Sequence, residues 1–270
     1  MESLEWLQVD CSLFAQFDGS PFLPWRTLAE AAEKWRTAGL YEWFWFVRKM
    51  PGLKLRFGGP GVAARLQAPL AEWLHHAERA NEIRGFRFTI YEPEIHRFGG
   101  EAGMAVAHSH FDNGAQLVLA YESQAESLPK EVDRLTFSLA NTNDLLDCAL
   151  ADEAEIWDVW KRLYAIVGGR ASDAESDEPL ALAGGFENLP VERSSQLGEL
   201  IAAAQTANAA CAEALRALAA GGVLQVGVRA WLTAATTFEW NRFGLPDQRE
   251  RLTAAITQIL RIHQPDTFIG

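Results

Sequence analysis

The sequence predicts an α+β fold, with an antiparallel sheet in the N-terminal half covered by helices and a helical C-terminal half. Three observations support this prediction. Segments that alternate between apolar and polar residues occur in the first hundred residues, and such alternation is typical of strands. From Glu101 onward, apolar residues recur mostly at helical spacing. Glycine and proline mark the ends of several segments. We expect one domain over residues 1–270.

The first predicted elements are a helix and a hairpin. The helix "LAEAAEKWRTAG" ends at Gly39. Residues 41–50, "YEWFWFVRKM", are rich in aromatic and β-branched side chains, which is typical of a strand. Pro51 and Gly52 then form a turn. Residues 53–57, "LKLRF", alternate again, so the two strands form a hairpin.

The alternation of the second hairpin strand separates two kinds of side chain. Leu53, Leu55 and Phe57 lie on one face of the predicted strand, whereas Lys54 and Arg56 lie on the other. The sequence therefore predicts a sheet with one apolar and one basic face at this strand.

A helix and a third alternating segment follow. "GGPG" at 58–61 is expected to open the helix. Its apolar stripe consists of Val62, Leu66, Leu70, Trp73, Leu74 and Ala77. Residues 85–93, "GFRFTIYEP", alternate between Phe86, Phe88 and Ile90 on one side and Arg87, Thr89 and Tyr91 on the other. A polar cluster at 91–97 thus follows the end of a strand.

The second half is predicted to be helical. Residues 128–150 and 152–169 form consecutive helices, and the glycine-rich, acidic segment 168–190 is expected to be a flexible loop. The next helix carries a packing seam, which we expect to be used within the chain. Two further helices follow, of which one stops at Gly244 and the other starts with Pro246 in its first turn. The seam residues are Leu197, Leu200, Ile201, Ala204, Ala207, Cys211, Leu215 and Leu218.

Composition excludes several classes of protein. The net charge is −12 and no basic run occurs, so binding to nucleic acid or to a membrane surface is not expected. No apolar stretch approaches the roughly 20 residues that span a bilayer, and the N-terminus does not resemble a signal peptide. The three cysteines are far apart, which indicates a reducing compartment. We expect a cytoplasmic protein. The ten tryptophans and fifteen phenylalanines fit a large core or a site for flat groups.

Familiar catalytic motifs are absent from the sequence. There is no GxxxxGK[ST], HExxH or GxSxG pattern. His108 and His110 would diverge by about 200° on a helix and cannot share a metal. We therefore expect no metal and no Ser–His–Asp triad.

Three polar sets remain as candidate sites. Lys54 and Arg56 share a strand face, and Tyr91, Glu94 and Arg97 follow the third alternating segment. Near the C-terminus a helix carries four polar residues that are expected to act together: Thr236, Thr237, Asn241 and Arg242. Two of the sets also have a structural explanation, because Glu94 and Arg97 suit an ion pair and the helix residues suit capping and hydrogen bonds to a neighbouring loop.

The order of three segments resembles a known family. "FWFVRKMPGLKLRFGG", "YEPEIHRFGGEAGMAVAHSHFDN" and "EWNRFGL" are similar to motifs of the C-terminal elimination domain of lantibiotic dehydratases. The same family includes thiopeptide-type bacteriocin biosynthesis proteins. The resemblance covers most of the chain, and "YEPE…R[FY]GG" is its most specific part. It implies an enzyme that modifies a ribosomally made precursor peptide.

The resemblance implies two alternative reactions. In the first, two arginines grip the carboxylate of a glutamylated Ser or Thr, and a histidine shuttles the proton as glutamate is eliminated. Here Lys54 replaces the first arginine, Arg56 is the second, and Thr237 replaces the histidine. Threonine cannot act as a general base near neutral pH.

The second reaction fits these replacements better. It is pyridine formation by a formal [4+2] aza-cycloaddition of two dehydroalanines, with loss of water and of the leader peptide. The resemblance implies hydrogen-bond donors at Arg56, Tyr91, Thr237 and Arg242, and no cofactor. Flat azoles of the substrate would stack on Trp43, Trp45, Phe57 and Trp240. Further substrate contacts are expected at Lys54, Glu94, Arg97 and Asn241.

Basic residues near the first helix are the candidate contacts to a leader peptide. Acidic leaders are expected to contact Arg26, Lys34 and Arg36, in or just before the first helix. A split glutamate-elimination subunit and a non-catalytic peptide-binding protein remain alternatives to the pyridine synthase. A homodimer is compatible with the sequence.

Overall fold

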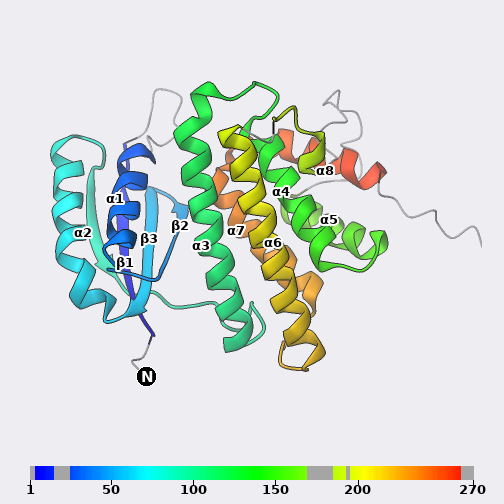
Figure 1. The fold of residues 1–270 in the computed structure, drawn as a ribbon, viewed down its shortest axis with the longest axis horizontal. Helices are drawn as coiled ribbons and strands as arrows, with labels where there is room; N and C mark the ends of the chain where they lie inside the picture. Colours follow the sequence, from blue (N-terminus) through cyan, green and yellow to red (C-terminus); the bar gives the residue numbers. More distant parts are fainter. Residues whose placement is uncertain (1–3, 15–24, 169–184, 193–194, 263–270) are drawn as a thin grey trace, which may run out of the picture. The chain divides into compact units, whose positions relative to one another are not determined.

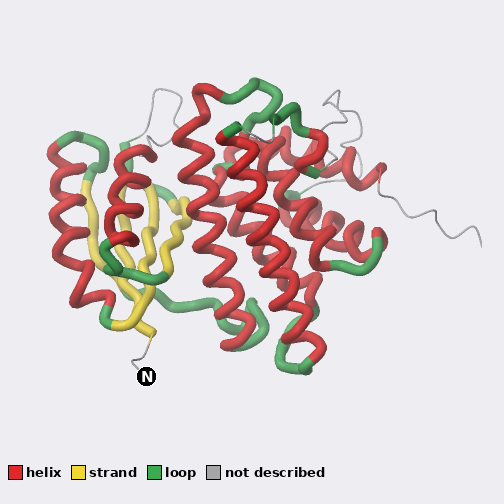
Figure 2. Tube along the Cα trace, in the orientation of Figure 1, coloured by secondary structure: helices red, strands yellow, loops and turns green. Residues whose placement is uncertain are grey.

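A computed structural model describes residues 4–14, 25–168, 185–192 and 195–262. It confirms the α+β prediction, because the strands all lie in the N-terminal part and helices make up most of the rest (Figure 2). The chain divides into two compact units. Unit 1 contains residues 1–93 and 111–126, and unit 2 contains residues 94–110 and 127–270. The single domain remains a prediction.

Unit 1 contains one antiparallel sheet of four strands in the order β2-β3-β1-β4. Both strands of the predicted hairpin are confirmed, and the third alternating segment forms a strand as expected. The sequence analysis did not predict β1, which nevertheless lies inside the sheet and pairs with both β3 and β4. The strands span β1 Leu4–Ser12, β2 Trp43–Lys49, β3 Gly52–Pro60 and β4 Gly85–Thr89.

One face of this sheet is covered by α1 (Trp25–Thr37) and α2 (Val62–Arg79) (Figure 1). The apolar residues predicted for one face of β3 are buried there, and Trp35 of α1 packs edge-on against Phe57 at 5.9 Å between ring centroids. The buried positions of α2 follow the predicted stripe, except that Trp73 is only half-buried. Burial of these side chains is the main stabilisation of unit 1.

Two details at the strand ends differ from the sequence prediction. Residues 58–60 continue β3, and α2 begins only after Gly61, because Gly58 and Gly59 still pair with β1. At the other end, β4 stops at Thr89, and Ile90 is 85% exposed rather than packed beside Phe88.

Helix α3 (Glu101–Gln124) contributes residues to both units. Within unit 1, Phe111 packs on Trp45 with ring centroids 4.6 Å apart. Asp112 accepts a hydrogen bond from the backbone N–H of Phe44 at 2.7 Å. Because β2 is an edge strand, this carboxylate covers one of its exposed donors.

The described part of unit 2 is helical. Its helices are α4 Arg134–Ala149, α5 Glu153–Ile166, α6 Gln196–Ala220, α7 Val228–Phe243 and α8 Arg249–Ile262. The helix predicted over 128–150 starts late, because Asp133 caps it and accepts a hydrogen bond from the Thr136 N–H at 2.9 Å. Asp152 caps α5 in the same way. Gly244 ends α7 in the left-handed conformation, as predicted.

The remaining predictions for unit 2 concern the seam of α6, the position of Pro246 and the loop over 168–190. The seam of α6 packs against α4 within the chain, as expected. Pro246 lies in a short 3₁₀ turn, Leu245–Gln248, and α8 begins after it. Of the loop expected over 168–190, residues 169–184 lie outside the described residues, and Phe186–Asn188 form another 3₁₀ turn.

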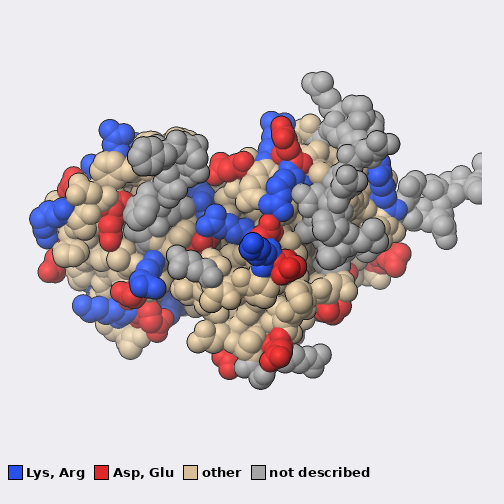
Figure 3. Space-filling view, turned by 90° about the horizontal axis from the view of Figure 1, so that it is seen from above, with Lys and Arg blue, Asp and Glu red and all other residues tan. Residues whose placement is uncertain are grey.

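Two further features concern the charge on the surface and the hydropathy of the helices. Basic and acidic side chains lie interspersed on the face drawn in Figure 3. None of the helices in the described part of the chain combines the length and the apolar character needed to cross a membrane.

Candidate functional site

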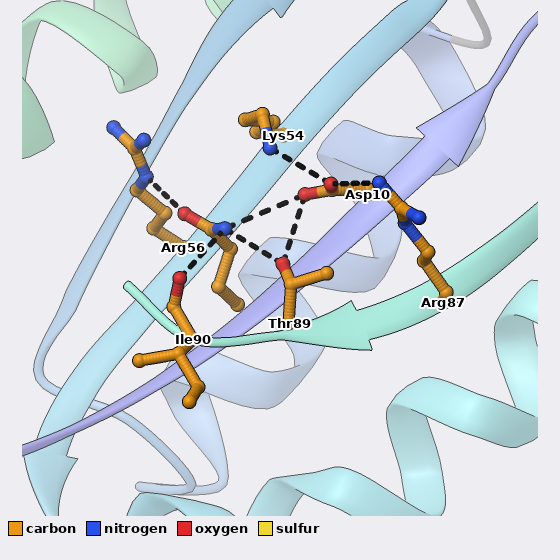
Figure 4. A network of polar contacts seen from close by, with 7 residues as sticks. Asp10, Lys54, Arg56, Arg87, Thr89 and Ile90 are labelled. Atoms are coloured by element: carbon orange, nitrogen blue, oxygen red, sulfur yellow. Dashed lines mark hydrogen bonds and ion pairs between the residues drawn. The ribbon is translucent and has the colours of Figure 1, made fainter. Parts of the chain in front are cut away.

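The face of the unit 1 sheet opposite α1 and α2 carries a network of polar side chains (Figure 4). The strand register places Gln8 opposite both Arg56 and Thr89. Asp10, two residues further along β1, lies opposite Lys54 and Arg87. Because side chains alternate along a strand, all of these point away from the face that α1 and α2 cover.

Arg56 is held on three sides. Its Nε donates a hydrogen bond to Gln8 Oε1 at 2.7 Å. Its guanidinium carbon lies 4.1 Å from the ring centroid of Trp45 and 4.5 Å from that of Tyr91. A guanidinium between two aromatic faces gains cation–π attraction and loses rotational freedom. The structure thus brings together three of the predicted site residues: Arg56, Tyr91 and Trp45.

The ring of Tyr91 is supported by Trp6, whose centroid is 5.0 Å away in an edge-on arrangement. Trp6 itself lies over Gly58, its partner across β3. A Cβ atom at position 58 would lie 2.9 Å from the Trp6 ring, so only glycine leaves room for this indole. Gly58 therefore helps to position Tyr91 through Trp6.

Lys54 is engaged by the protein's own carboxylate. Its Nζ lies 2.7 Å from Asp10 Oδ2, and Arg87 Nη2 is 3.6 Å from the same oxygen. Thr89 Oγ1 donates to Asp10 Oδ1 at 3.0 Å. Burial acts to raise the pKa of Asp10, but the hydrogen bonds from Lys54 and Thr89 and the two positive charges hold it below its usual value. Asp10 is therefore ionised near neutral pH and compensates Lys54.

The rest of the signature segment lies in unit 2. Arg97 Nη1 donates to Glu94 Oε2 at 3.0 Å, and its Nη2 donates to Thr237 Oγ1 at 3.1 Å. The guanidinium carbon lies 5.2 Å from the centroid of Phe238. The hydroxyl of Thr237 in turn donates to the carbonyl of Ala234 at 2.7 Å. The ion pair expected between Glu94 and Arg97 is present, and the hydrogen bond from Arg97 to Thr237 joins this loop to α7.

The glycine pair of the signature has a packing role. Gly99 and Gly100 have φ angles of +77° and +98°, which side-chain-bearing residues rarely adopt. A Cβ at Gly99 would meet Leu224 and Val226 at 2.9 Å. The Gly99 carbonyl accepts a hydrogen bond from the Gln225 N–H at 3.0 Å. The pair therefore lets the signature loop pack closely against residues 224–226.

Helix α7 separates the four polar residues that were expected to act together. Thr236 and Arg242 are 1% and 0% exposed, whereas Thr237 and Asn241 are half-buried. Positions 236 and 242 lie inside the helical core of unit 2, so they do not share one surface with the other two. Trp240 is also buried and stacks on Trp160 at 6.1 Å.

Arg242 belongs to a buried charged cluster. Burial lowers its pKa to about 10, against the opposing charge of Glu239. Burial also raises the pKa of Glu239, whose Oε1 accepts from Ser138 Oγ at 3.2 Å. His110, beside Trp231, has its pKa lowered to about 3 by burial and by the charge of Arg242. All three groups are buried among the helices of unit 2, where they are expected to have a structural role.

The remaining predicted residues lie in unit 1. Phe57 is fully buried on the helix-covered face, away from Arg56, while Trp43 is half-buried on the same face as Arg56. Arg26 and Lys34 are exposed on α1, and Lys34 lines a groove of about 490 Å³ between α1 and α2. Arg36 is bound to Asp112.

Three residues of this face, Trp6, Gln8 and Asp10, were not predicted from the sequence, because β1 was not expected. Their signal was present: these three residues alternate with Leu7, Val9 and Cys11 in "WLQVDC". In the described ranges, no three His, Cys, Asp or Glu side chains are grouped closely enough to hold a metal ion.

The chain matches one family model and is similar in fold to solved structures. Residues 13–260 match the family model described as lantibiotic biosynthesis dehydratase C-term. The structure is similar to the tRNA-dependent lantibiotic dehydratase MibB from Microbispora sp. 107891, with TM-score 0.69 and 16% identity over 97% of this chain and 28% of MibB. It is also similar to TsrL, with TM-score 0.54 and 15% identity over 98% of this chain and 96% of TsrL.

These similarities differ in what they establish. No curated protein sequence matches the chain. At identities of 15% and 16%, the two structures show a shared fold only. The chain spans little more than a quarter of the length of MibB. The family match, in contrast, covers most of this sequence, so the chain belongs to the lantibiotic biosynthesis dehydratase C-terminal family.

Proposed function

We propose that the chain is a pyridine synthase of thiopeptide biosynthesis, acting in the cytoplasm on a leader-bearing precursor peptide. Membership of the family links it to the biosynthesis of modified ribosomal peptides. The proposed substrate carries azoles and two dehydroalanines. The proposed site is the polar face of the unit 1 sheet, centred on Arg56.

The observation that carries this choice is the ion pair between Lys54 and Asp10, 2.7 Å from Nζ to Oδ2. Glutamate elimination requires cations that grip the carboxylate of the glutamyl group. Here one of the two cations is engaged by a carboxylate of the protein itself. A second carboxylate brought by the substrate would be repelled by Asp10. The arrangement therefore favours a substrate that presents neutral oxygen acceptors.

Arg56 and its two aromatic neighbours suit the cycloaddition. The reaction joins an iminol-form 2-azadiene, derived from one dehydroalanine and its amide, to the alkene of the other, forming two C–C bonds, while the ring nitrogen is the amide nitrogen already present. Elimination of water and then of the leader as an amide gives the pyridine. The main demand is alignment of two distant alkenes. Arg56 and Tyr91 would donate hydrogen bonds to the oxygen of the iminol and to the departing groups.

The other proposed contacts follow the same logic. Trp45, which is 1% exposed, supports Arg56 rather than offering a free ring, so Trp43 is the better candidate for stacking on azoles. In unit 2, Thr237, Asn241 and Arg97 are proposed as further contacts to the peptide. Lys34 and Arg26, both exposed, remain the proposed contacts to the leader. A homodimer is also part of the proposal.

A glutamate-eliminating subunit is the second candidate. Its support is the similarity of fold to MibB, a tRNA-dependent lantibiotic dehydratase. The presence of Lys54 and Thr237 at the positions of the family arginine and histidine counts against it.

Intact-mass analysis of the purified protein with synthetic peptides tests the proposal. One peptide carries a leader, thiazoles and two dehydroalanines; the other carries a glutamylated serine behind the same leader. We expect the first peptide to lose the leader and one water, and the second to remain unchanged. Loss of glutamate from the second peptide alone would establish elimination instead.

A binding measurement covers the third alternative. If neither peptide changes in mass but the leader-bearing peptide binds the protein in a fluorescence-anisotropy titration, the chain is a non-catalytic peptide-binding protein. The Arg56→Gln variant serves as the control in both assays, because it should bind the leader like the wild type and form product about 100-fold more slowly.

A further inference from the structure

Gln8 occupies the middle of the polar face although it carries no charge. It lies on the internal strand β1 and is 4% exposed. Its Oε1 accepts the 2.7 Å hydrogen bond from Arg56 Nε. Its Nε2 donates to Thr89 Oγ1 at 2.7 Å and to the backbone carbonyl of Ile90 at 3.2 Å. A single buried amide therefore links three strands.

The orientation of this amide is determined by its partners. Arg56 Nε carries a hydrogen and can only donate, whereas the carbonyl of Ile90 can only accept. Rotating the amide by 180° would place N–H against N–H and oxygen against oxygen. The amide oxygen of Gln8 therefore faces Arg56, and no second arrangement satisfies both partners.

This contact restricts the direction of the Arg56 guanidinium. The group is planar, so a hydrogen bond at Nε and aromatic rings at 4.1 and 4.5 Å leave little freedom for the two terminal nitrogens. In Figure 4 these nitrogens point away from Lys54 and Asp10.

Gln8 and Asp10, the two polar residues of β1 in this network, make different kinds of contact with the cations opposite them. Asp10 compensates the charge of Lys54, whereas Gln8 orients Arg56 without adding a negative charge. Gln8 Nε2 also lies 3.4 Å from Asp10 Oδ1, so the two residues belong to one network on this face.

We propose that Gln8 is a positioning residue, which sets the direction in which Arg56 presents its terminal N–H groups to a planar oxygen acceptor of the peptide substrate. The inference rests on the proposed function for the identity of that substrate. The positioning itself depends only on contacts within the sheet.

The first experiment tests the positioning without a substrate. The Nε–H resonance of Arg56 is identified in ¹⁵N-labelled protein by its loss in Arg56→Lys, and its exchange with solvent is measured. We expect slow exchange in the wild type and fast exchange in Gln8→Leu. Gln116→Leu is the matched control, because Gln116 hydrogen-bonds Asp112 at 2.8 Å elsewhere in unit 1 and should leave the resonance unchanged. Unchanged exchange in Gln8→Leu would overturn the inference.

The second experiment measures turnover of the peptide that the wild type converts. We expect Gln8→Leu to lower kcat by about ten- to hundred-fold, with KM changed by less than about three-fold, because misplacement of a donor affects mainly the transition state. In the Arg56→Lys background the same change should have little further effect. Losses that multiply would show that Gln8 does not act through Arg56. If the wild type converts neither peptide, the proposed function fails, while the exchange measurement still decides the role of Gln8.

Discussion

Arg56 in the sheet of unit 1 and Arg242 in helix α7 of unit 2 carry the same guanidinium group in opposite surroundings. Arg56 is half-buried, lies between two aromatic rings and is oriented by a neutral amide. Arg242 is 0% exposed and shares its core with Glu239 and His110. Both were expected to donate hydrogen bonds to a substrate, but only Arg56 has surroundings that suit this role.

This difference shows that a family motif does not by itself separate catalytic from structural residues. An arginine in a signature can serve the reaction, or it can hold together the helices that carry the rest of the site. Removing one partner of a buried ion pair leaves the other charge uncompensated, whereas removing a half-buried donor leaves the core intact. The following variants separate the two roles.

The largest effect is expected for Arg242→Met. Loss of the buried cation removes a positive charge that favours ionised Glu239 and should destabilise the protein by about 3–5 kcal/mol, measured by urea unfolding. The double variant Arg242→Met/Glu239→Gln should recover part of this loss. A variant with wild-type stability and no activity would instead place Arg242 in the chemistry.

Arg56→Gln should affect activity rather than stability. We expect kcat/KM to fall about 100-fold, since loss of one donor to a developing charge typically costs this much, while the midpoint of thermal unfolding changes little. Arg87→Gln is the matched control, because Arg87 lies on the same sheet face with its side chain 78% exposed. Equal losses in both variants would mean that the charge of the face matters and the position of Arg56 does not.

The buried His110 should make the protein sensitive to acid. Its pKa is about 3 in the folded state and near 6.5 when unfolded, so between these values the unfolded chain binds a proton that the folded one does not. Its contribution to stability is therefore complete above pH 6.5 and decreases as the pH falls, by on the order of 2 kcal/mol at pH 5. In His110→Asn the change in unfolding free energy between pH 7 and pH 5 should be smaller.

The control for this pH measurement is His96→Gln, since His96 is exposed. This variant should show the same change between the two pH values as the wild type. An equal reduction in both variants would show that the acid sensitivity has another source.

The smallest effect is expected for Thr237→Val. The change removes the 3.1 Å hydrogen bond from Arg97 while keeping the shape of the side chain, and should cost about 0.5–1.5 kcal/mol of stability. Turnover should fall by less than about five-fold, because the Thr237 hydroxyl donates to Ala234 within its own helix. A loss as large as that of Arg56→Gln would assign Thr237 to the reaction.

The parts of the fold that could be predicted are those with strong local patterns. The hairpin, the α2 stripe and the end of α7 at Gly244 follow from alternation, helical spacing and glycine. The start of α4 was predicted too early, because the cap at Asp133 lies inside a longer polar stretch. The start of α5 agrees with the prediction to within one residue. Strand β1 was missed although "WLQVDC" alternates clearly.

The candidate site could be predicted only in part, because its geometry depends on pairing between distant segments. Local pattern places Arg56 on a polar face, but it does not place Gln8 or Trp45 beside Arg56 across the sheet. Burial of Arg242 likewise results from the packing of several helices. Neither the strand register nor this packing is encoded in the spacing of nearby residues.

The position of β1 inside the sheet affects the order in which unit 1 can form during synthesis. Gln8 meets partners 48 and 81 residues further along the chain. A ribosome therefore releases this strand well before the segments that pair with it, and the backbone edge of β1 that faces β4 must remain unpaired until β4 has emerged. Such distant pairing slows folding and leaves a nascent strand open to wrong partners. The contacts that hold Arg56 can therefore form completely only after β4 has paired with β1.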